Sequence, residues 1–244
     1  MKPFKTIYIA HAGGGFNGTA YTNAAEAFIQ ADQSGFTYAE IDFCRTADGD
    51  YAAVHDWHTT YKTKYDGRSD RPVPTASEFL RSKPKYKGTS LTLKKGFGKV
   101  LKKTKLKFLI DAKHDLLKVC DIIRTKFPDE VHRIIPQAFT FREYEKLRQF
   151  FPEVILILYR SRRTEEAVIN FCRKNKPFAV AVSREKAVGF YLSKQLQALN
   201  VRAFCHTIND RNTAQSFQKN GFCGFYTDFL SSNGKKNTKT EDSA

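Results

Sequence analysis

The chain has 244 residues, of which 41% are hydrophobic, and its formal net charge is +16. The hydrophobic fraction excludes a disordered protein, and five widely spaced cysteines, an odd number, exclude a disulfide framework or a zinc–thiolate site. The positive charge attracts polyanions, so nucleic acid, phospholipid head groups and phosphate-containing polymers are all compatible with it.

Short apolar runs alternate with helical patterns along most of the chain, which is typical of βαβ units and a parallel sheet. Eight strands with intervening helices predict a (β/α)₈ barrel, an α/β fold that takes roughly 250 residues, as a single domain over residues 1–230. The predicted strands cover residues 6–11, 38–43, 107–113, 133–139, 154–159, 179–183, 202–208 and 224–227.

A further strand and a helix are predicted in the first quarter of the chain. Residues 51–56 follow the second strand too closely for a parallel crossover, so they form a hairpin that folds back over the mouth of the barrel. A helix is predicted over residues 24–33, with Thr22 or Asn23 as its cap and Glu26 in its first turn.

Residues 57–88 are polar, without a clear period, and predict a long loop or small insertion at the active face. Its aromatic residues Trp57, Tyr61, Tyr65 and Tyr86 either line a pocket for an alcohol head group or pack within the loop, and packing is favoured. The polar, lysine-rich residues 231–244 predict a disordered tail.

Acidic residues close two of the predicted strands. Glu40 and Asp42 lie two residues apart and therefore share one face of their strand. Asp111 ends another apolar run and shares a face with Lys113. Carboxylate oxygens suit Ca²⁺ or Mg²⁺, and the carboxyl ends of barrel strands are where active sites lie. Solvated carboxylates and a self-neutralising Asp–Lys pair are the alternatives.

Histidines follow two other strands. His11 ends the first strand and precedes three glycines, which let the backbone approach a ligand closely. His55 ends the hairpin strand. Because histidine titrates near neutral pH, both suit proton transfer, although a single histidine at a strand end is usually structural. Two histidines and three carboxylates at one barrel face predict an active site.

In this order the motifs resemble the signature of the glycerophosphodiester phosphodiesterases, over almost the whole chain. The first three motifs named below form a specific ordered set, and the later four are weaker. In the family, the later four motifs have Glu at the position of Asp111 and read Gln-Ser-Phe, Trp-Thr-Val-Asn-Asp and Gly-Ile-x-Thr-Asp. The motifs here are His11-x-Gly13, Glu40-x-Asp42, His55-Asp56, Asp111-x-Lys113, Gln137-Ala138-Phe139, His206-Thr207-Ile208-Asn209-Asp210 and Gly224-Phe225-Tyr226-Thr227-Asp228.

The resemblance implies metal-dependent hydrolysis of a glycerophosphodiester to glycerol phosphate and an alcohol. It implies that one divalent cation, Ca²⁺ or Mg²⁺, binds at Glu40, Asp42 and Asp111. His11 and His55 would then be the general acid/base pair, and Lys113 would hold the phosphate. A glycerophosphodiester from phospholipid turnover and a glycerol-phosphate polymer are both compatible substrates.

Two positions depart from the family pattern. The arginine that usually follows the first histidine is replaced by Ala12, and the usual Pro-Glu-Asn-Thr is Tyr21-Thr22-Asn23-Ala24, which keeps only the asparagine. These departures indicate a divergent subgroup in which Arg45, Lys113 or an arginine of residues 160–163 replaces the missing charge. Asn23 and Arg45 are therefore additional candidate site residues.

Two other functions compete with hydrolysis of a glycerophosphodiester. One is a non-catalytic binding module for anionic polymers, supported by the lysines of residues 94–107 but opposed by the complete set of carboxylates and histidines. The other is a nuclease, although the chain has no recognised nucleic-acid motif. No apolar segment reaches the ~18 residues of a membrane span, and no secretory signal is evident, so the sequence predicts a cytoplasmic protein.

Overall fold

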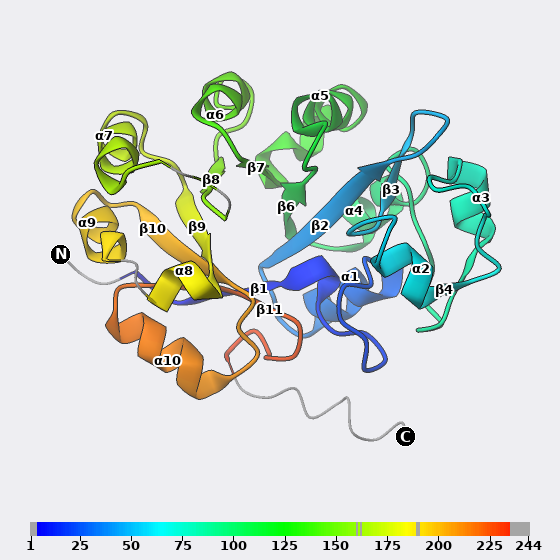
Figure 1. The fold of residues 1–244 in the computed structure, drawn as a ribbon, viewed down its shortest axis with the longest axis horizontal. Helices are drawn as coiled ribbons and strands as arrows, with labels where there is room; N and C mark the ends of the chain where they lie inside the picture. Colours follow the sequence, from blue (N-terminus) through cyan, green and yellow to red (C-terminus); the bar gives the residue numbers. More distant parts are fainter. Residues whose placement is uncertain (1–3, 160, 162, 189–190, 235–244) are drawn as a thin grey trace.

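The computed structural model describes residues 4–159, 161, 163–188 and 191–234. Eight parallel strands form a closed barrel, because β1 pairs with β11 on one side and with β2 on the other (Figure 1). The predicted (β/α)₈ fold is thereby confirmed. The barrel strands are β1 (Ile7–Ala10), β2 (Tyr38–Arg45), β6 (Lys107–Asp111), β7 (Ile134–Ala138), β8 (Ile155–Ile157), β9 (Ala179–Ser183), β10 (Arg202–His206) and β11 (Gly224–Thr227).

Helices surround the barrel and cover its outer face (Figure 1). A 3₁₀ turn, η1 (His11–Gly13), follows β1, and another, η2 (Pro128–Arg133), precedes β7. The α-helices outside the 57–88 region are α1 (Ala25–Gln33), α4 (Phe97–Lys103), α5 (Leu116–Lys126), α6 (Phe141–Leu147), α7 (Glu165–Asn175), α8 (Arg184–Val188), α9 (Leu192–Ala198) and α10 (Arg211–Lys219).

The predicted hairpin is present, and the predicted cap of the first helix is wrong. Strand β3 (Tyr51–Ala53) pairs antiparallel with the end of β2, but it is shorter than the predicted 51–56. Helix α1 has Ala24 as its N-cap, without a side-chain hydrogen bond, and Glu26 in its first turn. Asn23 does not cap the helix because its amide group is bonded to Asp42.

Residues 57–88 form an ordered insertion beside the barrel, on the right in Figure 1. It consists of α2 (Thr60–Lys64), β4 (Tyr65–Asp66), α3 (Ala76–Arg81) and β5 (Lys83–Pro84). Its aromatic side chains, joined by Phe79, pack against one another and against Ala24, Ala27 and Val54. Packing within the insertion, rather than a substrate pocket, is therefore the role of its aromatic residues.

Alternation along the strands separates an inner core from an outer one. In β6, Phe108 and Ile110 belong to the core that packs against the helices, whereas Leu109 belongs to the core inside the barrel. The same alternation sends Ile41 outward and its neighbours Glu40 and Asp42 inward. The polar residues of the motifs therefore enter the barrel because they occupy the inward positions of buried strands.

The remaining predictions concern the cysteines, membrane spans and the tail. All five cysteines are free. Among the described residues, no helix combines the length and the apolar composition that crossing a bilayer requires. At the end of the described chain, Gly234 donates a backbone hydrogen bond to Ser231. Residues 235–244, which carry most of the predicted disordered tail, lie outside the described part.

Candidate active site

The inward positions at the carboxyl ends of the strands line one cavity of about 520 Å³. In β10, for example, Phe204 fills the barrel interior and His206, two residues later, lines the cavity. The cavity contains all five predicted metal-binding and catalytic residues and Lys113. Its lining residues are His11, Tyr21, Glu40, Asp42, His55, Asp111, Lys113, His114, Gln137, Phe139, Tyr159, Ser183, His206 and Tyr226.

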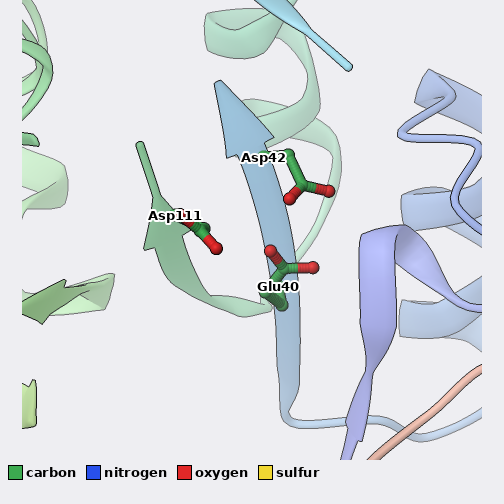
Figure 2. Close-up of side chains that lie close together, drawn as sticks. All are labelled: Glu40, Asp42 and Asp111. Carbon is green, nitrogen blue, oxygen red and sulfur yellow. The ribbon is translucent and has the colours of Figure 1, made fainter. Parts of the chain in front are cut away.

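Three carboxylates meet at one wall of this cavity. Asp42 and Asp111 are register partners on the adjacent strands β2 and β6, and Glu40 precedes Asp42 by two residues. Figure 2 shows the three side chains turned toward one another from these two strands. One carboxylate oxygen from each lies within 4.8 Å of the others. Glu40 and Asp42 are only 2% and 3% exposed.

Burial and mutual repulsion make this cluster unfavourable when all three groups are charged. Burial is the largest cause of the raised pKa of Glu40, followed by the charges of Asp42 and Asp111. The pKa of Asp111 is raised by burial and by Asp42, although Lys113 opposes the rise. Its buried Oδ1 has no hydrogen-bond partner among the described residues. A divalent cation would relieve both the repulsion and this unpaired oxygen.

His11 is held by a carboxylate from the last strand of the barrel. Its Nδ1 lies 3.0 Å from Oδ1 of Asp228, whose other oxygen accepts a hydrogen bond from Asn209 at 2.9 Å. Because a carboxylate only accepts, the pair favours the tautomer in which His11 carries its hydrogen on Nδ1. His11 Nε2 is then left with a lone pair for proton transfer.

His55, which lines the same cavity, has a similar arrangement. Its Nδ1 lies 2.9 Å from Oδ2 of Asp56, and its Nε2 lies 3.0 Å from Nζ of Lys113. Burial opposes ionisation of Asp56, but hydrogen bonds from His55, Thr59 and Thr60 outweigh it and lower the pKa of Asp56. Each candidate catalytic histidine is thus oriented by an aspartate.

The additional site residues predicted from the sequence, Asn23 and Arg45, do not line the cavity. Asn23 donates through Nδ2 to Asp42 Oδ2 at 2.9 Å and accepts from the Asp42 backbone at 3.0 Å, so it orients a candidate metal ligand. Arg45 is exposed at the end of β2, and its carbonyl accepts a hydrogen bond from Trp57. Arg160 and Arg162 lie outside the described residues, and Arg163 stacks over Phe141.

The glycines after His11 approach the protein itself rather than an open site. A Cβ on Gly15 would lie 2.5 Å from the ring of Phe229 and 2.7 Å from the carbonyl of Asp228. Gly15 also donates its backbone hydrogen to that carbonyl. The close backbone approach expected at these glycines is therefore made to Asp228 and Phe229, which follow the last barrel strand. This contact brings Asp228 beside His11.

Several residues of the site were not singled out from the sequence. Asp228 and Asn209 lie in the two late motifs of the family resemblance, so a signal for them existed. His206, in one of these motifs, packs against Tyr159 with ring centroids 3.7 Å apart and the rings tilted by 40°. Burial, and after it the neighbouring His11, Lys113 and His55, lower the pKa of His206 to about 4, although Glu185 opposes this, so His206 is neutral at pH 7. Tyr21 could have been suspected only because its segment, Tyr21-Thr22-Asn23-Ala24, departs from the family pattern.

Comparison with solved structures identifies the fold. No protein-family model and no curated protein sequence matches the chain. The structure is similar to that of a glycerophosphodiester phosphodiesterase from Thermotoga maritima, with 17% identity over 93% of this chain and 96% of that one and a TM-score of 0.68. The chain has the glycerophosphodiester phosphodiesterase fold.

Two further structures share this fold. One is a putative glycerophosphodiester phosphodiesterase from Galdieria sulphuraria, with 14% identity over 96% of this chain and 97% of that one and a TM-score of 0.72. The other is a phosphodiesterase from Oleispira antarctica in complex with the product sn-glycerol-3-phosphate, with 17% identity, coverage of 92% and 94%, and a TM-score of 0.68. The resemblance found in the motifs is thus confirmed at the level of the fold.

Proposed function

We propose that this protein is a metal-dependent phosphodiesterase that hydrolyses a glycerophosphodiester to glycerol phosphate and an alcohol. The observation that carries the proposal is the convergence of three carboxylates and two aspartate-braced histidines in one cavity. The fold supports it, because the structures that share it include a glycerophosphodiester phosphodiesterase and a phosphodiesterase in complex with the product sn-glycerol-3-phosphate.

The carboxylate cluster fits a divalent cation. Glu40, Asp42 and Asp111 offer only oxygen ligands, which suit Ca²⁺ or Mg²⁺ better than softer metals. Asn23 and the backbone N–H of Ala12 already bond to Asp42 and Glu40, and such outer contacts orient metal ligands. When bound, the cation would polarise a phosphoryl oxygen and lower the pKa of a coordinated hydroxyl.

The chain's own residues would move the protons. One histidine takes the proton of the attacking hydroxyl, and the other gives a proton to the leaving alkoxide. Water as the attacking group gives glycerol phosphate directly, whereas a neighbouring glycerol hydroxyl gives a cyclic phosphate that water must then open, with the two histidines in exchanged roles. Asp228 and Asp56 keep His11 and His55 in position and stabilise each ring when it is charged. Lys113, beside His55, would hold the phosphate oxygens through its ammonium group.

We extend this proposal to the compartment in which the protein acts and to the source of its substrate. Five free cysteines suit a reducing compartment, which favours the cytoplasm. A glycerophosphodiester released in phospholipid turnover is the substrate that suits that location. The glycerol-phosphate polymer considered from the sequence suits the basic charge of +16.

The test is hydrolysis of a panel of glycerophosphodiesters with Ca²⁺, with Mg²⁺ and with chelator. We expect turnover that needs the cation and falls by about 10²-fold or more in His11→Ala and in Asp42→Asn. His132→Ala is the matched control, because His132 is exposed on η2, away from the cavity. An absence of turnover and of cation binding, with retained binding of a glycerol-phosphate polymer, would favour the non-catalytic binding module instead.

A further inference from the structure

The ring of Tyr21 lies between the two candidate catalytic histidines. Its centroid is 4.5 Å from that of His11 and 5.0 Å from that of His55, and both contacts are edge-to-face. Tyr21 also lines the cavity. A diester placed for proton transfer with both histidines would therefore lie close to Tyr21.

The backbone of Tyr21 is held in this position by the insertion. Its φ of +54° is in the left-handed region, which a bulky residue rarely adopts unless its surroundings impose it. Lys64 of α2 donates a hydrogen bond to the carbonyl of Ala20, and its ammonium lies 5.4 Å from the centroid of the Tyr21 ring. Tyr86 donates from its hydroxyl to the carbonyl of Thr22 at 2.9 Å.

The hydroxyl of Tyr21 is a neutral donor at the pH of the cell. Burial raises the pKa of Tyr21; a hydrogen bond with Thr207 lowers it, and the nearby carboxylates, Asp228 foremost, raise it further. The phenol therefore keeps its proton and offers it as a hydrogen-bond donor. A neutral donor suits this place, because it stands beside carboxylates without needing a charge of its own.

The cavity also lacks the arginine expected after the first histidine. Ala12 stands there, fully buried, and its backbone N–H donates to Glu40. Among the described residues that line the cavity, Lys113 is the one lysine or arginine. Besides the proposed cation and Lys113, a nonbridging phosphate oxygen can accept a further hydrogen bond, and charge-assisted hydrogen bonds to phosphate are strong.

We propose that Tyr21 is a substrate-binding residue whose hydroxyl donates a hydrogen bond to a nonbridging phosphate oxygen, in place of the missing arginine. This inference rests on the proposed function, since it assigns a residue to the same site. The insertion then has a definite function, because its contacts with residues 17–22 fix Tyr21 between the histidines.

The experiment measures the binding of inorganic phosphate and of sn-glycerol-3-phosphate by calorimetry, in the presence of the cation. Tyr21→Phe keeps the ring and removes only the hydroxyl. Tyr144→Phe is the matched control, because it also removes a tyrosine hydroxyl, one that donates to the backbone carbonyl of Asn175, from a residue of α6 that does not line the cavity. Thermal unfolding of each variant shows whether it is folded.

We expect Tyr21→Phe to weaken the binding of both ligands by about 10- to 100-fold, the effect of losing a hydrogen bond to a charged group. Tyr144→Phe should lower the melting temperature yet change the affinity by less than about threefold. Equal affinity of Tyr21→Phe and the wild type, or an equal loss in both variants, would overturn the proposal. Because binding is measured without turnover, the result decides the role of Tyr21 even if no glycerophosphodiester is hydrolysed.

Discussion

Some residues of the cavity lower the stability of the fold because their charges are needed for the proposed chemistry. Glu40, Asp42 and Asp111 bring three carboxylates together in the interior, and two of the three have a raised pKa because of burial and repulsion. Repelling charges in a protein interior destabilise the fold. Such clusters are typical of sites that need the charges for their function.

The first prediction follows from this repulsion. Asp111→Asn should stabilise the chelator-treated protein at pH 7, by about 1 kcal/mol or more, because it removes one charge whose Oδ1 has no hydrogen bond to lose. A melting temperature about 2–4 °C higher is the expected reading. The same variant should lose cation-dependent turnover. A lower melting temperature with chelator would contradict the repulsion between the carboxylates.

The same groups predict how stability depends on pH. Their pKa is higher in the folded state than in the unfolded chain. Above about pH 4 the folded protein therefore keeps protons that the unfolded chain has released, and its stability falls as the pH rises toward the folded-state pKa. The free energy of unfolding of the chelator-treated wild type should therefore gain a contribution at pH 5 that it loses by pH 7. In Asp111→Asn this dependence should be weaker, which urea titrations at both pH values would measure.

The third prediction concerns the carboxylate behind His11. In Asp228→Asn, an amide replaces the group that accepts from His11 Nδ1, so the imidazole loses the constraint on its tautomer. We expect kcat to fall by about 10²-fold or more, with little change in KM. Asp129→Asn is the control, since Asp129 is exposed on η2. An unchanged kcat would show that Asp228 is only structural.

Strand-end motifs were readable from the sequence because local chemistry determines them. Glu40, Asp42 and Asp111 end buried apolar runs, and alternation alone assigns them to one face. Asp228 was harder, because it meets His11 across 217 residues of chain and only through closure of the barrel. Tyr21 was not foreseen, because its position depends on tertiary contacts with Lys64 and Tyr86.

At the level of elements, the sequence predicted the strands better than the insertion. All eight barrel strands were predicted, since each is a short apolar run between polar turns. Strand ends were less accurate: β8 covers Ile155–Ile157 instead of 154–159. The small elements of residues 57–88 were missed because they have no periodicity, and aromatic contacts among distant residues stabilise them.

The insertion should behave as a small core of its own. Phe79 is fully buried and contacts the rings of Trp57, Tyr61 and Tyr65. Phe79→Ala should therefore cost about 3–5 kcal/mol in the region it supports. Amide hydrogen exchange should show faster exchange in residues 57–88 and in the loop that carries Tyr21. Phe150→Ala, at a ring that is 52% exposed, is the control, and equal effects of the two would contradict this prediction.

At the scale of the whole molecule, the charge of +16 acts on substrates before they reach the cavity. A basic surface raises the rate of encounter with anions, and salt screens this attraction over a Debye length of about 10 Å at 0.1 M. The effect depends on the net charge of the substrate, not on its contacts in the cavity. Two diesters that differ in net charge can therefore separate the surface field from the site.

The last prediction compares glycerophosphoglycerol, which is anionic, with glycerophosphocholine, which is zwitterionic. Between low salt and roughly 0.5 M salt, kcat/KM for the anionic diester should fall several-fold more than for the zwitterionic one, because only the former is attracted by the net charge. Salt weakens any binding to a basic protein, so binding alone would be uninformative. Parallel salt dependences of kcat/KM for the two substrates would mean that the basic surface does not steer the substrate and that the charge acts on another anionic partner.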